Sequence, residues 1–294
     1  MTTDPGTIPP HALRRVIETA LEEDAPWGDV TSETLIPVEA TATATLGARE
    51  PGVLSGGAVF VAVMHAVDPS IQAVVHVADG THFAAGDVLA TVTGSARAVL
   101  RAERVALNLV QRMSGIATAT AAHVAAAAGT AARIVDTRKT TPGLRALERY
   151  AVRCGGGHNH RTSLSDAVLA KDNHLAVLLA GGIGIGDAIA QARRRLGHTV
   201  HVEVEVDRID QIEPVVAAGV DTVMLDNFTR DELVTGVGIV AGRALVEASG
   251  GVSLDTVAAI AATGVDVISV GALTHSARAL DLGLDIDVAV PTGD

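Results

Sequence analysis

Apolar residues recur with more than one period along the chain. Residues 11–23 place apolar side chains on one side at helical spacing, which predicts a short amphipathic helix. From about 41 to 94, short β-type runs are separated by Gly and Asp-Gly signals, so we expect a small sheet with strands at 41–46, 73–77 and 88–92. Residues 97–128 predict one long helix, in which Gly115 is the main breaker.

After residue 132, short apolar runs alternate with helical segments. The predicted strands are 133–136, 167–170, 200–206, 222–225, 245–248 and 267–270, and helices are predicted from Leu144 onward and at 186–196, 208–218, 230–241 and 254–262. Strands that alternate with helices form a parallel sheet with right-handed crossovers. Six such strands in succession favour an α/β barrel over an open sheet.

Composition narrows the class of protein. Hydrophobic residues make up 48% of the chain and aromatic residues only 2%, so the core must consist of Ala, Val, Leu and Ile. The single Cys154 cannot form an internal disulfide, which fits a reducing compartment. No apolar run reaches the roughly 18–20 residues that span a bilayer, and residues 1–5 lack the features of a secretory signal. We therefore expect a cytoplasmic protein.

The net charge of −12 argues against nucleic acid or an anionic membrane as a partner. Against this negative net charge, cations gather in one segment. The whole chain has 22 Lys and Arg residues, of which only two are lysines, and both lysines lie in this segment. Because the chain uses arginine for nearly all its other positive charges, a retained lysine indicates a need for a compact ammonium group. The cluster predicts a polyanionic ligand, and the alternative is a solvated charged face. Its members are Arg138, Lys139, Arg145, Arg149, Arg153, His158, His160, Arg161 and Lys171.

Carboxylates stand at the ends of two predicted strands, where the ligand groups of α/β barrels project. Glu203 and Glu205 face the same side of one strand because they are two residues apart, and Asp226 ends the next strand. Such carboxylates can hold ribose hydroxyls, hold Mg²⁺ or stabilise a developing cation. The alternative is that one glutamate forms a structural ion pair with an arginine, and we assign that role to Glu203.

Ser249, Gly250 and Gly251 lie between a predicted strand and a helix that Ser253 can cap, and Gly271 closes the next strand. Glycines there let backbone N–H groups approach a phosphate, which the helix N-terminus also attracts. Phosphate sites recur at the last two strand–helix loops of barrels. The pattern favours a phosphate site over an ordinary turn.

Two further polar patterns leave alternatives open. Arg97, Arg101, Arg104 and Asn108 form a stripe on an otherwise apolar helix, which either faces solvent or reaches a neighbouring subunit. His158 and His160 have no Cys or third His at metal-ligand spacing, so we do not expect structural zinc. His160, beside Arg161, fits an anion contact better.

Taken in order, the polar motifs resemble those of the quinolinate phosphoribosyltransferase family, over nearly all 294 residues. The motifs that carry the resemblance are Glu23-Asp24, Gly28-Asp29-Val30-Thr31-Ser32, Ala102-Glu-Arg-Val-Ala-Leu-Asn108, Ser114-Gly-Ile-Ala117, Asp136-Thr-Arg-Lys-Thr-Thr-Pro-Gly143, Gly155-Gly-Gly-His158, His160-Arg161, Lys171-Asp-Asn-His174, Val202-Glu-Val-Glu205, Leu225-Asp-Asn-Phe228, Glu247-Ala-Ser-Gly-Gly251 and Ser269-Val-Gly-Ala-Leu-Thr-His275.

This resemblance implies an N-terminal open-faced α/β sandwich over 1–114 and an incomplete, TIM-like α/β barrel over 115–275, with 276–294 packing back on the sandwich. It implies a homodimer in which each subunit completes the active site of the other. The implied reaction joins quinolinate to phosphoribosyl pyrophosphate with Mg²⁺ as cofactor, and releases pyrophosphate and CO₂ to leave nicotinate mononucleotide.

The resemblance also implies roles for single residues. Quinolinate carboxylates would be held by Arg138, His160, Arg161 and Lys171, with Arg104 arriving from the partner subunit. Lys139 would serve the pyrophosphate, and the 5′-phosphate would lie at Ser249, Gly250, Gly251 and Gly271, near His275. Glu205 and Asp226 would serve the ribose hydroxyls, the magnesium and the positive charge that grows at C1. The implied catalytic set is Lys139, Lys171, Glu205 and Asp226.

Two other functions fit part of the pattern. A transferase that takes nicotinate would need to neutralise one carboxylate, and the abundance of cations favours two. A non-catalytic relative that binds a phosphorylated ligand need not retain Lys139, Glu205 and Asp226, all of which are present.

Overall fold

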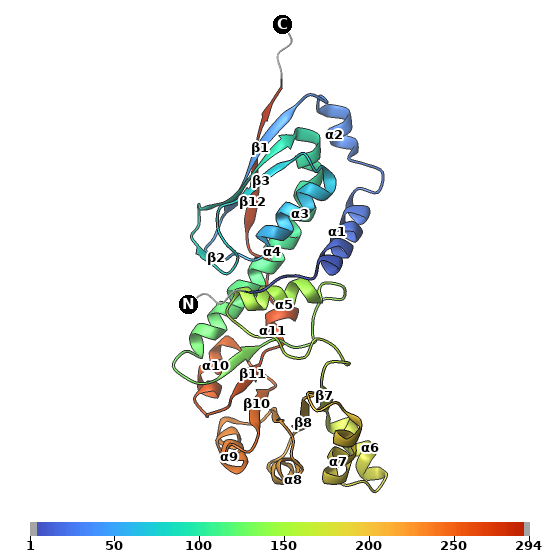
Figure 1. Ribbon diagram of the computed structural model, residues 1–294. Coiled ribbons are helices and arrows are strands. Elements are labelled where there is room, and N and C mark those ends of the chain that lie inside the picture. Colours follow the sequence, from blue (N-terminus) through green and yellow to red (C-terminus); the bar gives the residue numbers. More distant parts are fainter. Residues whose placement is uncertain (1–4, 291–294) are drawn as a thin grey trace. The chain divides into compact units, whose positions relative to one another are not determined.

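A computed structural model describes residues 5–290 of the chain, so the predictions for residues 1–4 and 291–294 lie outside the described part. Within this range the chain divides into two compact units (Figure 1). The first contains residues 5–121, 140–156 and 274–290, and the second contains 122–139 and 157–273. No helix of the described residues is long and apolar enough to cross a membrane.

The first unit is built on a four-stranded antiparallel sheet in the order β12-β1-β5-β3. Burial alternates along β1, where Ala42, Ala44, Leu46 and Ala48 are buried, so that only one face of the sheet is covered. This is the open-faced sandwich that the family resemblance implies. Its strands are β1 Thr41–Ala48, β3 Gln72–Val75, β5 Val88–Ser95 and β12 Leu282–Ala289, and a small separate pair is formed by β2 Gly52–Val53 and β4 His82–Phe83.

The three strands predicted for the first unit correspond to β1, β3 and β5, but β12 was not predicted as a strand. It comes from the far end of the chain and pairs with β1 from Ala289 opposite Thr41 to Leu282 opposite Ala48. The helices are α1 Pro10–Asp24, α2 Val30–Leu35, α3 Gly57–Val67 and α5 Arg145–Cys154, while α4 Ala96–Ala126 and α11 Ala272–His275 contribute residues to both units.

The second unit contains a six-stranded parallel sheet in the order β6-β11-β10-β9-β8-β7. Its strands are β6 Arg133–Val135, β7 Val168–Ala170, β8 Val202–Val206, β9 Thr222–Asp226, β10 Leu245–Ser249 and β11 Val267–Ser269. All six predicted strands are therefore present. β6 and β7, consecutive in the chain, lie at opposite edges of this sheet. The barrel is incomplete because it stays open between them, which confirms the predicted fold class.

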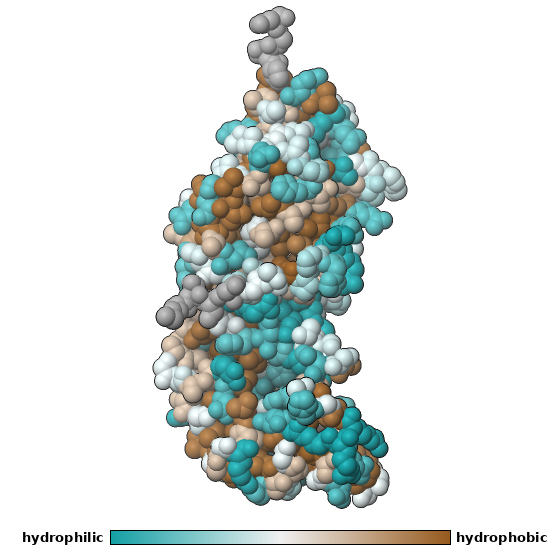
Figure 2. All heavy atoms as spheres, in the orientation of Figure 1, coloured by the Kyte–Doolittle hydropathy of each residue, from teal (hydrophilic) through white to brown (hydrophobic). Residues whose placement is uncertain are grey.

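Crossover helices connect these strands. They are α6 Asp172–Ala180, α7 Ile185–Arg195, α8 Ile212–Ala217, α9 Arg230–Val240 and α10 Leu254–Ala261. The segment predicted as one helix at 208–218 is instead a 3₁₀ turn, η1 Ile209–Gln211, followed by α8. Pro214 lies in the first turn of α8, where its missing N–H would have no partner in any case. Figure 2 shows hydrophilic surface over α7, whose last turn carries Arg193, Arg194 and Arg195.

Two glycines of α9 provide a matched test of how closely this helix packs on β9. A Cβ at Gly236 would lie 2.7 Å from Leu225 Cδ1 and 3.3 Å from Ile212 Cδ1, whereas a Cβ at Gly238 would meet no atom within 4 Å. Gly238→Ala should raise the free energy of unfolding by up to about 1 kcal/mol through helix propensity. In Gly236→Ala the same gain should be cancelled, because overpacking of the new methyl group costs about 1–3 kcal/mol. Urea unfolding measures both variants, and equal stabilisation would contradict the close packing of α9 on β9.

Candidate active site

A cavity of about 400 Å³ opens in the second unit at the carboxyl ends of its parallel strands. The cavity is lined by Leu169, Met224 and a larger set of charged and polar residues. The charged and polar residues are Thr137, Arg138, Lys139, His160, Arg161, Lys171, Glu205, Asp226, Glu247, Ser249 and Ser269. A larger groove of about 690 Å³ in the first unit runs along α1 and α3, with mainly apolar surface. The smaller cavity is the candidate site because polar groups from several strands converge there.

The loop that carries His160 is anchored on a buried carboxylate. Asp136, which follows β6, is fully buried; it accepts a hydrogen bond from Asn159 Nδ2 at 2.6 Å and one from the His160 backbone N–H at 2.8 Å. His158 extends this contact along β6, because its N–H donates to Ile134 O and its O accepts from Asp136 N–H. The position of His160 is therefore fixed through its own backbone.

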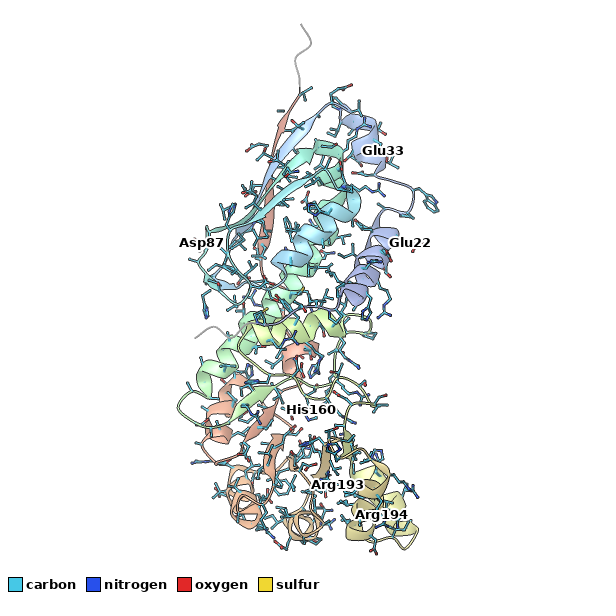
Figure 3. All side chains as sticks on the ribbon, in the orientation of Figure 1. Glu22, Glu33, Asp87, His160, Arg193 and Arg194 are labelled. Carbon is cyan, nitrogen blue, oxygen red and sulfur yellow. The ribbon has the colours of Figure 1, made fainter. Side chains whose placement is uncertain are left out.

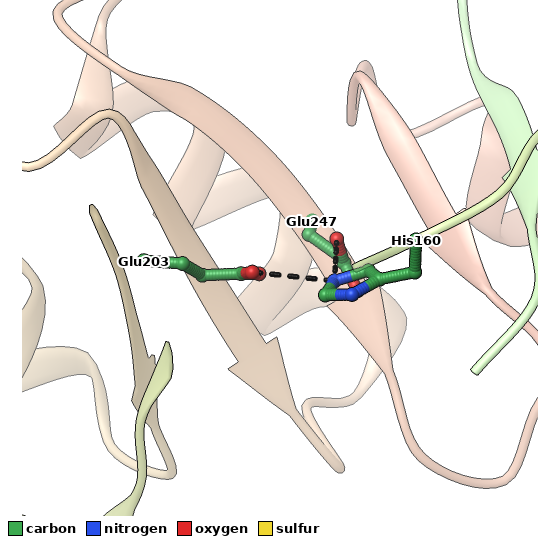
Figure 4. A group of neighbouring side chains, drawn as sticks. All are labelled: His160, Glu203 and Glu247. Atoms are coloured by element: carbon green, nitrogen blue, oxygen red, sulfur yellow. Dashed lines mark ion pairs between the residues drawn. The ribbon is translucent and has the colours of Figure 1, made fainter. Parts of the chain in front are cut away.

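The His160 ring lies between two glutamates from different strands (Figure 4). Its Nε2 is 3.2 Å from Oε2 of Glu203 on β8 and 3.4 Å from Oε2 of Glu247 on β10. Both glutamate side chains are nearly fully buried. The structural ion pair assigned to Glu203 is present, but the predicted arginine partner was wrong: the partner is His160, which the loop after α5 carries into this unit (Figure 3).

In this cluster, burial and the neighbouring charges shift the pKa of His160 in opposite directions. Burial by itself would lower the pKa of His160, but the hydrogen bonds and charges of Glu203 and Glu247 outweigh it and raise the pKa to about 10. Burial raises the pKa of Glu203, and the neighbouring Glu247 adds to this while His160 opposes it. An imidazolium that neutralises buried carboxylates is therefore the stable form at neutral pH.

The same three side chains have the composition of a metal site. One nitrogen and two carboxylate oxygens lie within 4.8 Å of one another. The second oxygen, Oε1, of both Glu203 and Glu247 is buried and has no hydrogen-bond partner among residues 5–290. Chain spacing of Cys and His could not reveal this group, because two of its members are carboxylates from separate strands.

Cations also converge at this cavity and form what we call its cationic wall, which contains Arg138, Arg161 and Lys171. Burial and the charge of Arg138 lower the pKa of Arg161, and both guanidinium groups line the cavity. Arg161 Nη1 also donates to Ala167 O at 3.1 Å. Lys139 follows a turn in which its N–H donates to Thr137 Oγ1 at 3.0 Å. Like charges held together favour an anionic ligand, since such a ligand would relieve their repulsion.

Two carboxylates at the cavity each accept one hydrogen bond from another side chain. Lys171 Nζ donates to Glu205 Oε2 at 2.6 Å, and Asn227 Nδ2 donates to Asp226 Oδ2 at 2.7 Å. The second oxygen of Glu205 and of Asp226 has no hydrogen-bond partner within the described residues. These are hard oxygen donors at the edge of a cavity, which is the donor type that Mg²⁺ prefers.

The predicted phosphate loop follows β10 directly. Ser249 pairs with Asp226 across the sheet and lines the cavity. Gly250 and Gly251 both have positive φ, 89° and 61°, a conformation that glycine adopts readily. α10 then begins at Leu254 with Ser253 as its N-cap.

The structure brings together eight of the thirteen predicted site residues. Those that line the cavity are Arg138, Lys139, His160, Arg161, Lys171, Glu205, Asp226 and Ser249. Gly250, Gly251 and Gly271 belong to the same unit but are not among its lining residues, and Arg104 and His275 belong to the first unit. Glu247 was missed as a site residue. The available signal was a carboxylate inside the apolar run 245–248, which is rarely tolerated without a partner.

Comparison with known proteins agrees across the whole chain. Residues 29–114 match the model of the quinolinate phosphoribosyl transferase N-terminal domain, and residues 116–285 match that of its C-terminal domain. A nicotinate-nucleotide pyrophosphorylase [carboxylating] from Mycobacterium leprae is 44% identical over 281 residues, which cover 94% of this chain and 97% of the relative. A probable enzyme of the same name from Bacillus subtilis is 39% identical, with 94% of each chain covered.

A solved structure extends the likeness to three dimensions. The crystal structure of NadC from Streptococcus pyogenes is 38% identical to this chain and superposes with a TM-score of 0.91, covering 97% of this chain and all of that one. Both domain models match in order, and the matches leave only short terminal segments outside. The chain belongs to the quinolinate phosphoribosyltransferase family.

Proposed function

We propose that this chain transfers the phosphoribosyl group of phosphoribosyl pyrophosphate to quinolinate, with loss of CO₂, to form nicotinate mononucleotide in the biosynthesis of NAD. The observation that carries this proposal is one cavity in which cations and carboxylates from different strand ends meet. Membership of the family and the names of the relatives supply the substrate identities.

The cationic wall supports a dicarboxylate substrate. Arg138, Arg161 and Lys171 all line the cavity. A guanidinium can grip a carboxylate with two parallel hydrogen bonds, and an ammonium adds a point charge. We assign quinolinate to this wall. His160 lines the same cavity and would stay charged there, with Glu203 and Glu247 as its counter-ions.

Other residues at the same strand ends support phosphoribosyl pyrophosphate. The 5′-phosphate is assigned to Ser249, Gly250, Gly251 and Gly271, with His275 nearby, and the pyrophosphate to Lys139. Glu205 and Asp226 would hold the ribose hydroxyls and Mg²⁺. Their uncommitted oxygens fit this ion, which usually takes one or two protein carboxylates and completes its shell with phosphates and water. When bound, Mg²⁺ would neutralise charge on the departing pyrophosphate.

These positions account for the chemistry. As the bond from C1 to pyrophosphate breaks, positive charge grows on the ribose, and a carboxylate about 4 Å away is worth roughly 4 kcal/mol at an effective dielectric of about 20. The quinolinate nitrogen forms the new bond to C1 and becomes cationic. When the bond from C2 to its carboxylate breaks, that cationic ring accepts the electron pair until a proton replaces CO₂ at C2. No organic cofactor is required.

We further propose a homodimer with shared active sites, in which Arg104 serves the partner's cavity. Arg104 and Asn108 are exposed on α4 between buried apolar residues, so the stripe is available for a contact. A run of exposed large apolar side chains in the same unit also favours an interface, because isolated chains rarely expose so many together. These are Trp27, which is 93% exposed, Val30, Leu35 and Val38.

A cytoplasmic location remains our proposal. It is supported by Cys154, the chain's one cysteine, which is a buried free thiol. Burial raises the pKa of this thiol to about 12, so it is protected from reaction rather than used in it.

The activity is tested by incubating the purified chain with quinolinate, phosphoribosyl pyrophosphate and Mg²⁺. We expect equal amounts of nicotinate mononucleotide, pyrophosphate and CO₂, since each turnover produces one of each. Nicotinate in place of quinolinate serves as the control substrate and should react far more slowly, because it lacks the second carboxylate. Binding of either substrate without CO₂ release would favour a non-catalytic relative.

The charge of His160 predicts a pH effect that needs no turnover. Because its pKa is raised to about 10, the ring should stay doubly protonated at pH 8, whereas an unfolded chain loses that proton near pH 6.5. The stabilisation from this cluster is full below about pH 6.5 and disappears as the pH rises through about 10. Nitrogen NMR of the ring, assigned with His160→Gln, measures the titration, and urea-unfolded protein provides the reference. A neutral His160 ring at pH 7 would contradict this.

Complementation tests the shared site. Arg104→Ala and Asp226→Ala should each lose most activity, because each removes a charge-assisted contact worth roughly 1.5–3 kcal/mol. Co-refolding the two variants in equal amounts should restore up to about a quarter of wild-type activity, since about half of the dimers are mixed and each has one intact site. Arg138→Ala mixed with Asp226→Ala is the matched control and should restore none. The same result from both mixtures would remove Arg104 from the partner's site.

A further inference from the structure

Asn227 has a backbone conformation that non-glycine residues rarely adopt. It follows Asp226, the last residue of β9, and its φ is 59°, in the left-handed region. Among the described residues, the other non-glycine residue with positive φ is Ala241, which is the C-cap of α9. Asparagine tolerates this region better than most residues because its short amide can form local hydrogen bonds.

The side chain and the backbone of Asn227 hold two different parts of the cavity wall. Its Nδ2 donates to Asp226 Oδ2 at 2.7 Å, which restricts the orientation of the carboxylate. Its backbone N–H donates to Ser249 O at 2.8 Å, which extends the pairing of β9 with β10 by one residue. One residue therefore connects a carboxylate at the end of β9 with the turn after β10.

Gly250 packs directly on this residue. A Cβ at Gly250 would lie 2.1 Å from Asn227 Oδ1, 2.6 Å from its Cγ and 2.8 Å from its backbone N, so a side chain there is excluded. The φ of Gly250, 89°, adds a second reason for glycine. The Ser249–Gly251 turn is thus in close contact with Asn227, the residue whose amide also binds Asp226.

We propose that Asn227 is a positioning residue that sets the separation between the Asp226 carboxylate and the Ser249–Gly251 turn, and so fits both to one ligand that carries a sugar and a phosphate. The inference rests on the proposed function, in which this ligand is phosphoribosyl pyrophosphate. Asp226 would then meet the ribose while the turn meets the 5′-phosphate of the same molecule. The cationic wall for quinolinate is formed by other strands, so binding of quinolinate should not depend on Asn227.

The decisive variant is Asn227→Gly, which keeps access to positive φ and removes only the amide side chain. Isothermal titration with phosphoribosyl pyrophosphate and Mg²⁺ should show binding at least about tenfold weaker, because the Asp226 carboxylate loses the amide that orients it toward the ligand. Quinolinate affinity should change by less than about twofold. The matched control is Ala241→Gly, which makes the same kind of change at the other positive-φ position and should leave both affinities as in wild type.

A double variant tests the contact itself. Gly250→Ala should weaken phosphoribosyl pyrophosphate binding strongly in wild type, where the new methyl group meets the Asn227 side chain. In the Asn227→Gly background two of the three close contacts are gone, so the same substitution should have an effect at least about threefold smaller. Equal effects in both backgrounds would show that Gly250 does not seat on Asn227.

The outcomes separate this inference from the function on which it rests. If the wild-type chain fails to bind phosphoribosyl pyrophosphate, the proposed function fails and the inference falls with it. If wild type binds and Asn227→Gly binds equally well, the inference alone is overturned. Thermal unfolding of each variant is measured beside the titrations. If Asn227→Gly loses affinity for quinolinate to the same degree as for phosphoribosyl pyrophosphate, the effect is general destabilisation and the positioning role is overturned.

Discussion

The parallel sheet of the second unit forces charged side chains from separate strand ends into one cavity, and the rest of the site depends on this constraint. All six strands point the same way, so β6, β7, β8, β9 and β10 each end with, or are followed by, a polar group at the same edge. Arg138, Lys139 and Lys171 would repel one another without the carboxylates of Glu205 and Asp226 nearby. These carboxylates therefore offset part of the repulsion before any substrate enters, and an anionic ligand would offset more of it.

At this cavity, the buried cluster of His160, Glu203 and Glu247 poses a second electrostatic problem. Two carboxylates this deeply buried would be costly if both were ionised alone. The imidazolium between them offsets much of that cost, and Asp136 holds the His160 backbone in place. These contacts define where the charges of the cluster lie, which matters because catalysis by electrostatics needs preorganised charges.

At the glycine-rich turn after β10, backbone conformation also helps to place the groups of the site. Gly250 can approach Asn227 because it lacks a Cβ, and Asn227 can accept that approach because it adopts a left-handed conformation. Two residues with positive φ values thus connect a carboxylate to the turn after β10. Strain of this kind persists where neighbouring contacts define the conformation, and it concentrates at functional sites.

The sequence by itself determined the alternation of strands and helices, because the apolar periods of β6 to β11 are local properties of the chain. It also determined the cationic segment and the motifs at strand ends, since a parallel sheet places those ends together whatever its exact geometry. Only the tertiary structure decided that Glu203 pairs with His160, that Glu247 joins them, and that β12 completes the first sheet on β1. These contacts join residues tens to hundreds of positions apart, and no local period or spacing records which side chains then come within hydrogen-bonding distance.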